Sequence, residues 1–189
     1  MAFPTDIDSY CDWMEQMAKD HKLLQHGVDV NGSGQQEAYG EVWISSDPME
    51  KIDFSSFFNQ LRGKIKYPVL INLGASFDLD KEEHRTTNAE AMWAVLCKAD
   101  PKTLKNGDGR KEARRVAEAV AKDLCARIGK YFELNVHWGR MAEKMTTEPI
   151  GPLSVDGKLY GVVVNFNYVI NQQPCYNENQ WDNPVTREE

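Results

Sequence analysis

The sequence predicts an α+β fold in which a mixed or antiparallel sheet packs against two main amphipathic helices. Two segments, 4–26 and 109–130, repeat apolar residues at helical spacing, whereas 67–73 and 159–170 are apolar, β-branched runs of the kind that form strands. The 189 residues predict a single α+β domain over 1–172, followed by an extended or disordered C-terminal tail, 173–189.

The first helix is predicted over residues 4–26. Its apolar residues fall mostly three and four positions apart, with charged residues between them. Thr5 is the predicted N-cap, and Gly27 is the residue expected to end the helix. Residues 28–36, rich in Gly, Asn and Ser, predict a loop.

Two short elements are predicted next. Residues 41–44 suit a strand. Asp53 is the expected N-cap of a short helix that places the phenylalanines and the leucine of 54–61 on one face and ends at Gly63.

The middle of the chain predicts a strand and a hairpin. Residues 67–73 form the strongest strand candidate, in which Pro68 is acceptable only near the start or on a sheet edge. Residues 76–80 alternate with period two. Residues 86–98 suit either a helix or a strand; we favour a strand, because a hairpin with 76–80 would satisfy both backbones.

The strongest helix is predicted over residues 109–130, with Gly129 ending it. Asp156-Gly157 then predicts a hairpin turn before a long β-branched strand over 159–170. The apolar stripe of the helix comprises Ala113, Val116, Ala117, Val120, Leu124 and Ile128.

Charge and composition exclude several classes. The net charge is −7, whereas binding to a phosphate backbone requires clustered Lys and Arg. No stretch approaches the ~20 apolar residues of a membrane span, and the N-terminus lacks the features of a secretory signal. The four cysteines are far apart, which predicts reduced, mostly buried thiols in a cytosolic setting.

No residue pattern predicts a catalytic residue, a cofactor site or a metal site. His21 and His26 lie five positions apart, on different faces of the first helix, and are expected to be solvated. The run from Asp78 to His84 could hold Ca²⁺ or Mg²⁺, but solvated charges at a strand edge explain it better. His137 could be a general base, yet without a nucleophile it is expected to be a half-buried structural histidine.

Tyr176 and Trp181 are the candidate interface residues. They are isolated aromatics in a polar tail, and Trp and Tyr are frequent anchors of protein contacts. We therefore expect the tail to order on an adjacent subunit, the alternative being a disordered terminus with incidental aromatics.

The order of the predicted elements, and the closing segment Asp156-Gly157-Lys158-Leu159-Tyr160-Gly161-Val162, resemble the tail terminator (neck, or tail-completion) proteins of tailed bacteriophages and related contractile tail machines, over residues 5–170. The resemblance implies a non-enzymatic virion protein, assembled in the bacterial host cytoplasm. It would form a homo-oligomeric ring, six copies being the expectation, at the head-proximal end of the tail tube and join the tail to the neck. The implied partners are further copies of the chain and the tail tube, sheath and neck proteins, with genome DNA passing through without specific binding and no membrane involved.

A closed ring is the natural product of head-to-tail interfaces, expected here at exposed strand edges, at the tail, and at the loops 28–36 and 101–109. Two alternatives remain. The first is another head–tail connector or tail-tube-associated virion protein. The second is a small metal-dependent hydrolase that uses the Asp78–His84 run or His137.

Overall fold

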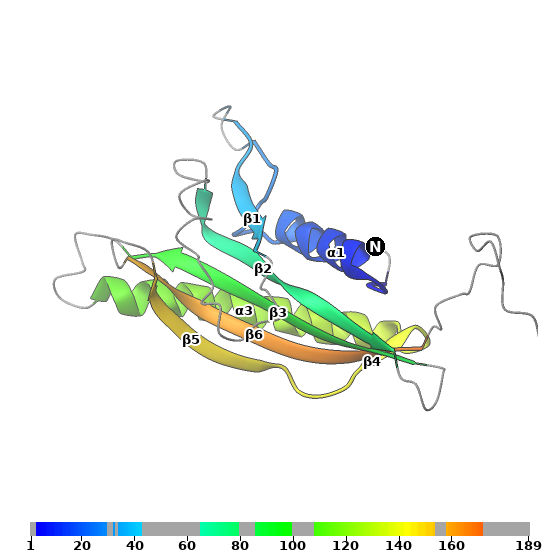
Figure 1. Cartoon of the computed structure of the whole chain (residues 1–189). Coiled ribbons are helices and arrows are strands. Elements are labelled where there is room, and N and C mark those ends of the chain that lie inside the picture. The colour runs from blue at the N-terminus through cyan, green and yellow to red at the C-terminus, as the bar shows by residue number, and fades with distance from the viewer. Residues whose placement is uncertain are drawn as a thin grey trace, which may run out of the picture.

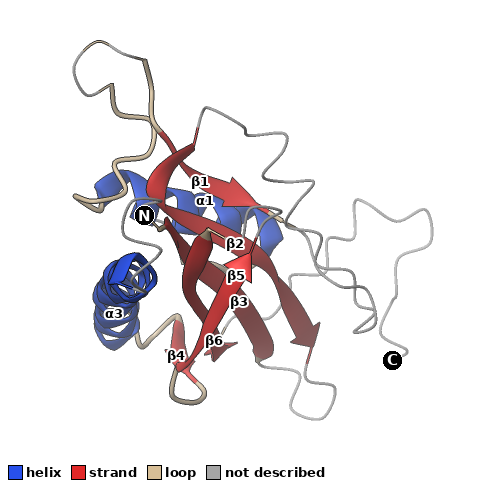
Figure 2. Ribbon diagram, turned by 90° about the vertical axis from the view of Figure 1, so that its left-hand side faces the viewer, coloured by secondary structure: helices blue, strands red, loops and turns tan. Residues whose placement is uncertain are grey.

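The computed structural model describes residues 3–29, 32, 34–42, 65–79, 86–99, 108–153 and 158–171. In this part of the chain, a six-stranded mixed sheet is covered on one face by two helices (Figures 1 and 2), which confirms the predicted α+β class. The helices are α1 (Ile7–Asp20) and α3 (Asp108–Leu134); the strands are β1 (Glu37–Glu41), β2 (Ile65–Leu79), β3 (Thr87–Lys98), β4 (Gly139–Met141), β5 (Thr146–Leu153) and β6 (Leu159–Ile170).

The strand order is β1-β2-β3-β6-β4, and β5 pairs with the same edge of β6 as β4 does. β1 and β2 are parallel, whereas every other pair is antiparallel, so the sheet is mixed. Helix α1 lies over β1 and β2, and α3 lies mainly over β3 and β6 (Figure 1).

Helix α1 begins and ends differently from the prediction. Its N-cap is Asp6 rather than Thr5, because the Asp6 carboxylate accepts the Ser9 N–H at 2.8 Å while the Ser9 hydroxyl accepts the Asp6 N–H at 3.0 Å. The helix ends at Asp20 instead of residue 26, because His21 already has an extended backbone. The turn that follows places Gly27 at a φ of +73°, where glycine is favoured.

Helix α3 continues past Gly129 to Leu134, so the prediction that Gly129 ends it is wrong. The apolar stripe extends to Phe132, whose ring lies 6.2 Å from Trp13 and 5.2 Å from Tyr168. This aromatic packing outweighs the roughly 1 kcal/mol that a glycine costs inside a helix.

Strand β2 joins the two segments that were predicted separately, 67–73 and 76–80. Gly74 does not break the strand but sits in an irregularity of the β2–β3 register, with a φ of +108°. Pro68 lies near the start, as required, because pairing with β3 begins at Val69. The hairpin and the strand prediction for residues 86–98 are both confirmed.

The remaining predictions have mixed outcomes. β1 covers 37–41, so it shares only Glu41 with the predicted strand 41–44, and Val42 is not part of it. Residues 43 and 44 and the expected helix over 54–61 lie outside the described residues. β5 and β6 pair as the closing hairpin predicted. β4 was not predicted; it is three residues long and is formed by pairing with the end of β6.

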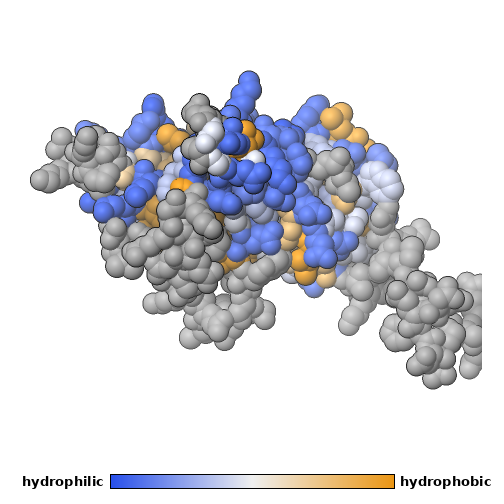
Figure 3. Space-filling view, turned by 90° about the horizontal axis from the view of Figure 1, so that it is seen from above, coloured by the Kyte–Doolittle hydropathy of each residue, from blue (hydrophilic) through white to orange (hydrophobic). Residues whose placement is uncertain are grey.

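The main core lies between the helices and the sheet. Its largest buried side chains are aromatic, and a second, smaller apolar cluster that includes Ile71 and Leu96 occupies the opposite face of the sheet. Seen from above, the described surface is mainly hydrophilic, with hydrophobic residues in separate groups (Figure 3). The largest side chains of the main core are Trp13, Trp93, Tyr10, Tyr168 and Phe166.

Candidate interaction surfaces

Three large apolar side chains are exposed where α3 ends. Leu134 is 68% exposed, Val136 61% and Trp138 39%. Single exposed apolar residues are ordinary, but three within five consecutive residues concentrate exposed apolar side chains at one turn. We call Leu134, Val136 and Trp138 the end surface.

Hydrogen bonds hold the turn that carries the end surface. Asn135 donates to the Tyr131 carbonyl through its backbone N–H at 3.1 Å and through its side-chain Nδ2 at 2.8 Å. The Trp138 N–H donates to the Asn135 carbonyl at 2.9 Å. The apolar side chains therefore project from a fixed backbone.

Aromatic rings fill the interior behind this turn. Phe3 packs edge-on against Phe132, with 5.3 Å between ring centroids, and also contacts Tyr131 and Tyr168. A Cβ atom at Gly139 would lie 2.5 Å from the Phe3 ring, so β4 needs a glycine there. Phe3 therefore fills the space between the end of α3 and β4.

The chain leaves β6 directly beside the end surface. The backbone N–H of Asn171 donates to the Trp138 carbonyl at 2.8 Å, and its side chain donates to the Val136 carbonyl at 3.2 Å. Tyr176 and Trp181 lie outside the described residues, so their role as interface anchors stays a prediction.

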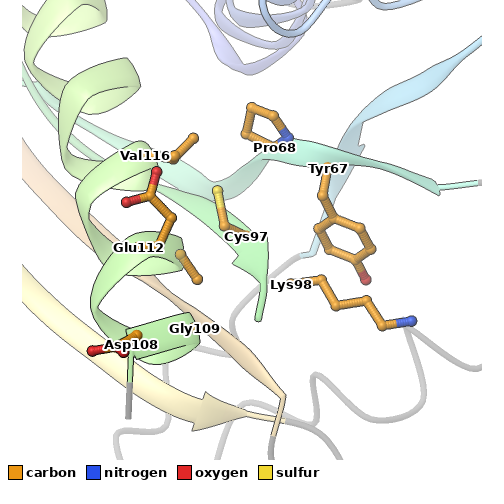
Figure 4. A pocket seen from close by; sticks show the side chains of 9 residues that line it. Tyr67, Pro68, Cys97, Lys98, Asp108, Gly109, Glu112 and Val116 are labelled. Atoms are coloured by element: carbon orange, nitrogen blue, oxygen red, sulfur yellow. The ribbon is translucent and has the colours of Figure 1, made fainter. Parts of the chain in front are cut away.

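A pocket of about 440 Å³ lies near the other end of α3, between the helix and the sheet (Figure 4). The start of β2, the end of β3 and the first turns of α3 form its walls. The described residues that line it are Tyr67, Pro68, Cys97, Lys98, Asp108, Gly109, Glu112, Ala113 and Val116. We call this cavity the α3 pocket.

The side chains that line the α3 pocket suit the binding of a ligand better than a nucleophilic reaction. Burial raises the pKa of the Cys97 thiol to about 12, so this thiol is protonated and weakly nucleophilic at neutral pH. Burial also raises the pKa of Tyr67. The Glu112 carboxylate is paired with Arg115 at 3.0 Å, and none of the described lining residues is a histidine. The walls combine apolar side chains with the charged side chains of Lys98, Asp108 and Glu112, so they suit an apolar or aromatic group that has a polar edge.

The prediction that His21 and His26 are solvated is wrong. Their side chains are only 10% and 13% exposed, and each faces a carboxylate: His21 lies 3.2 Å from Asp123 and His26 lies 3.4 Å from Glu15. Because α1 ends at Asp20, neither histidine lies on the helix, and the face argument does not apply.

These contacts hold the first helix in place. His21 and the ion pair between Asp20 and Arg127 fasten the end of α1 to α3, and His26 accepts the Ala38 N–H at 3.2 Å. Burial lowers the pKa of His21, more than the nearby Asp123 raises it. The two histidines are therefore structural.

His137 is exposed, so its prediction as a half-buried histidine is also wrong; its ring lies 5.3 Å from the Trp138 ring. Asp78 is exposed, and the residues from Asp80 to His84 lie outside the described part. Among the described residues, no group of three or more His, Cys, Asp or Glu side chains could hold a metal ion.

Sequence reasoning missed both surfaces. The end surface was not predicted because the helix was expected to end at Gly129. The apolar residues that recur from Tyr131 to Trp138 could have indicated that the helix continues. The α3 pocket has no local signal, because three separate elements build it.

Comparison with known proteins finds no family that matches this sequence and no curated protein similar to it. Neither described helix has the length and apolar character needed to cross a bilayer.

Proposed function

We propose that this protein is a structural assembly component that forms a ring from copies of itself and acts as a tail terminator, capping the head-proximal end of a tail tube and joining it to the neck. The main support for self-assembly is the end surface, where three exposed apolar side chains project from a hydrogen-bonded turn. Burying such a patch against another copy is favourable, by about 25 cal/mol per Å² of apolar area.

The positions of the two surfaces support a head-to-tail contact. Helix α3 (Figure 1) has 27 residues and is therefore about 40 Å long. Residues of its first turns line the α3 pocket, and the end surface begins at its last residue, Leu134. Surfaces at opposite ends of one protomer meet in a heterologous contact, and heterologous contacts close into rings when the rotation permits.

The terminator role itself rests on the resemblance of the element order and the closing hairpin. The net charge of −7 is compatible with a lumen that repels DNA rather than grips it. A different head–tail connector or a tube-associated protein would use the same surfaces, and the partner bound distinguishes these roles.

The test of assembly is size-exclusion chromatography with light scattering over a range of concentrations. The wild-type chain should form oligomers, and the double variant Leu134→Ser/Val136→Ser should shift them toward single copies. Leu23→Ser is the matched control, because Leu23 is 52% exposed but lies outside the end surface. A wild-type chain that stays a single copy at every concentration would overturn the proposal.

The test of the terminator role is binding to a purified tail-tube protein. Rings that cap tube ends in electron micrographs would support it. Rings that bind only a neck or head protein would favour the connector role.

A further inference from the structure

We propose that Trp181 of one copy inserts into the α3 pocket of the next copy, so that residues 172–189 act as an arm between neighbours. This inference rests on the proposed self-assembly and names a contact that would hold the copies together. Its support comes from the pocket, from the charges around it and from the position of Asn171.

The α3 pocket suits a single large aromatic anchor. Its volume is about 440 Å³, and Pro68, Ala113 and Val116 give it apolar walls (Figure 4). Trp is the most favourable anchor for such a cavity, because it buries a large apolar ring and keeps one N–H donor. The Glu112 carboxylate in the pocket wall can accept that N–H.

The arm is acidic, whereas basic side chains outnumber the two acidic residues, Asp108 and Glu112, around the pocket; one of the basic residues, Arg115, is paired with Glu112. Residues 172–189 carry four acidic side chains and one basic side chain, and acidic residues lie on both sides of Trp181. The pocket lies at the N-terminal end of α3, where the helix dipole also favours negative charge. The exposed basic residues on the first turns of this helix are Arg110, Lys111, Arg114 and Arg115, and Lys98 lines the pocket.

The length of the arm decides between the pocket of the same copy and that of a neighbour. Asn171 is fixed beside Trp138, and Trp181 lies ten positions further along the chain, a stretch that spans at most about 33–36 Å. The axial rise from Glu112 to Leu134 is already about 33 Å. The rise from Val116, the lining residue furthest along α3, is about 27 Å, so the arm would reach its own pocket only in a largely extended form, whereas in a head-to-tail arrangement the neighbour's pocket would lie close to Asn171.

The first test measures binding of the arm alone. The probe is a fluorescein-labelled peptide of residues 172–189, and the receptor is the full chain carrying Trp181→Ala. Fluorescence anisotropy should show saturable binding that weakens as salt is raised. A peptide carrying Trp181→Ala should bind at least about tenfold more weakly, whereas one carrying Gln180→Ala should bind as the wild-type peptide does.

Receptor variants then locate the binding site. Val116→Phe, which fills the pocket from a half-buried position, should weaken binding by at least about tenfold. Ala119→Phe is the matched control, because Ala119 is exposed on the same helix but does not line the α3 pocket. Lys98→Glu gives a second pocket variant at an exposed residue and should also weaken binding. Absence of binding, or binding that neither pocket variant changes, would overturn the inference.

The second test asks which copy supplies the arm. A photo-crosslinking residue replaces Trp181, and ¹⁵N-labelled and unlabelled copies are mixed before irradiation. Crosslinks between labelled and unlabelled chains at α3 pocket residues are expected; crosslinks confined to single copies would overturn the inference. If wild-type oligomers form but Trp181→Ala leaves them unchanged, the inference that Trp181 links the copies is refuted, whereas the proposal of self-assembly stands. If the wild-type chain never assembles, the assembly proposal itself fails.

Discussion

Replacing Gly161 by alanine should destabilise the protein strongly, because two backbones approach closely at this residue. Gly161 lies in β6 opposite Leu96 of β3 and opposite Ile150 of β5. A Cβ atom here would overlap the carbonyl oxygen of Val95 and lie 2.7 Å from Cδ2 of Leu96. The overlapped oxygen belongs to the backbone of a central strand, so it cannot rotate away, and β3 and β6 must separate locally.

The size of the effect follows from two contributions. Overpacking in a well-packed interior costs about 1–3 kcal/mol. Separating the strands also weakens one or two sheet hydrogen bonds, each of which contributes about 1 kcal/mol. We therefore expect Gly161→Ala to lower the free energy of unfolding by about 2–5 kcal/mol, a large part of the ~5–15 kcal/mol of a typical domain.

The matched control is Gly129→Ala, which makes the same chemical change inside α3. A Cβ at Gly129 would meet no other atom within 4 Å. Alanine favours the helix over glycine by about 0.5–1 kcal/mol, so this variant should be more stable than the wild type. The same glycine-to-alanine change should therefore lower the free energy of unfolding at Gly161 and raise it at Gly129.

The assay is equilibrium unfolding in guanidinium chloride, followed by tryptophan fluorescence and by far-ultraviolet circular dichroism. Trp13 and Trp93 are buried and should report loss of the core. If Gly161→Ala stays within about 1 kcal/mol of the wild type, an effect ordinary for point mutants, the close approach of β3 and β6 is refuted.

Three further predictions test the helix cap, a buried histidine and the thiols. Asp6→Ala should lower the free energy of unfolding by about 0.5–2 kcal/mol in thermal melts, because it removes the cap of α1; an unchanged midpoint would contradict the capping box. Burial lowers the pKa of His21 below its ordinary 6.5, so stability should be full above that pH and fall as the pH drops below it, because the unfolded chain binds the proton more readily. Urea midpoints between pH 7.5 and 5 should show this fall, and His21→Gln should flatten it. Burial raises the pKa values of Cys97 and Cys125 to about 12 and 11, so iodoacetamide at pH 8 should label them at least about 100-fold more slowly in the folded chain than in guanidinium; equal rates, measured by peptide mass spectrometry, would contradict their burial.

Local patterns in the sequence predict the elements that local physics decides. The apolar, β-branched runs of 67–73 and 159–170 predict strands, and the apolar stripe beginning at Ala113 predicts α3. The limits of elements depend instead on distant contacts. Helix α3 passes Gly129 because Phe132 packs against Trp13 and Tyr168, which lie far away in the sequence.

The candidate surfaces also divide into features that the local sequence indicates and features that depend on contacts between distant residues. Tyr176 and Trp181 stand out in the sequence because they are aromatic residues in a mostly polar segment. The α3 pocket cannot be predicted in this way, because Tyr67, Cys97 and Glu112 come together only through the sheet register and the packing of α3. His21 and His26 likewise acquire their carboxylate partners only when the chain turns after Asp20.

The edges of the described sheet oppose association of copies by strand addition. Edge-to-edge pairing requires a row of free backbone N–H and C=O groups. The exposed edge strand β5 contains Pro149 and Pro152, which have no N–H to donate, and β1 is only five residues long, with Glu37 and Glu41 at its two ends. Strand edges were expected to contribute to the interfaces, but these features oppose strand addition at both sides of the described sheet. Insertion of Trp181 into the α3 pocket of a neighbour, as proposed, would bury apolar area beside the end surface without adding a strand, so the proposed assembly needs no extension of the sheet.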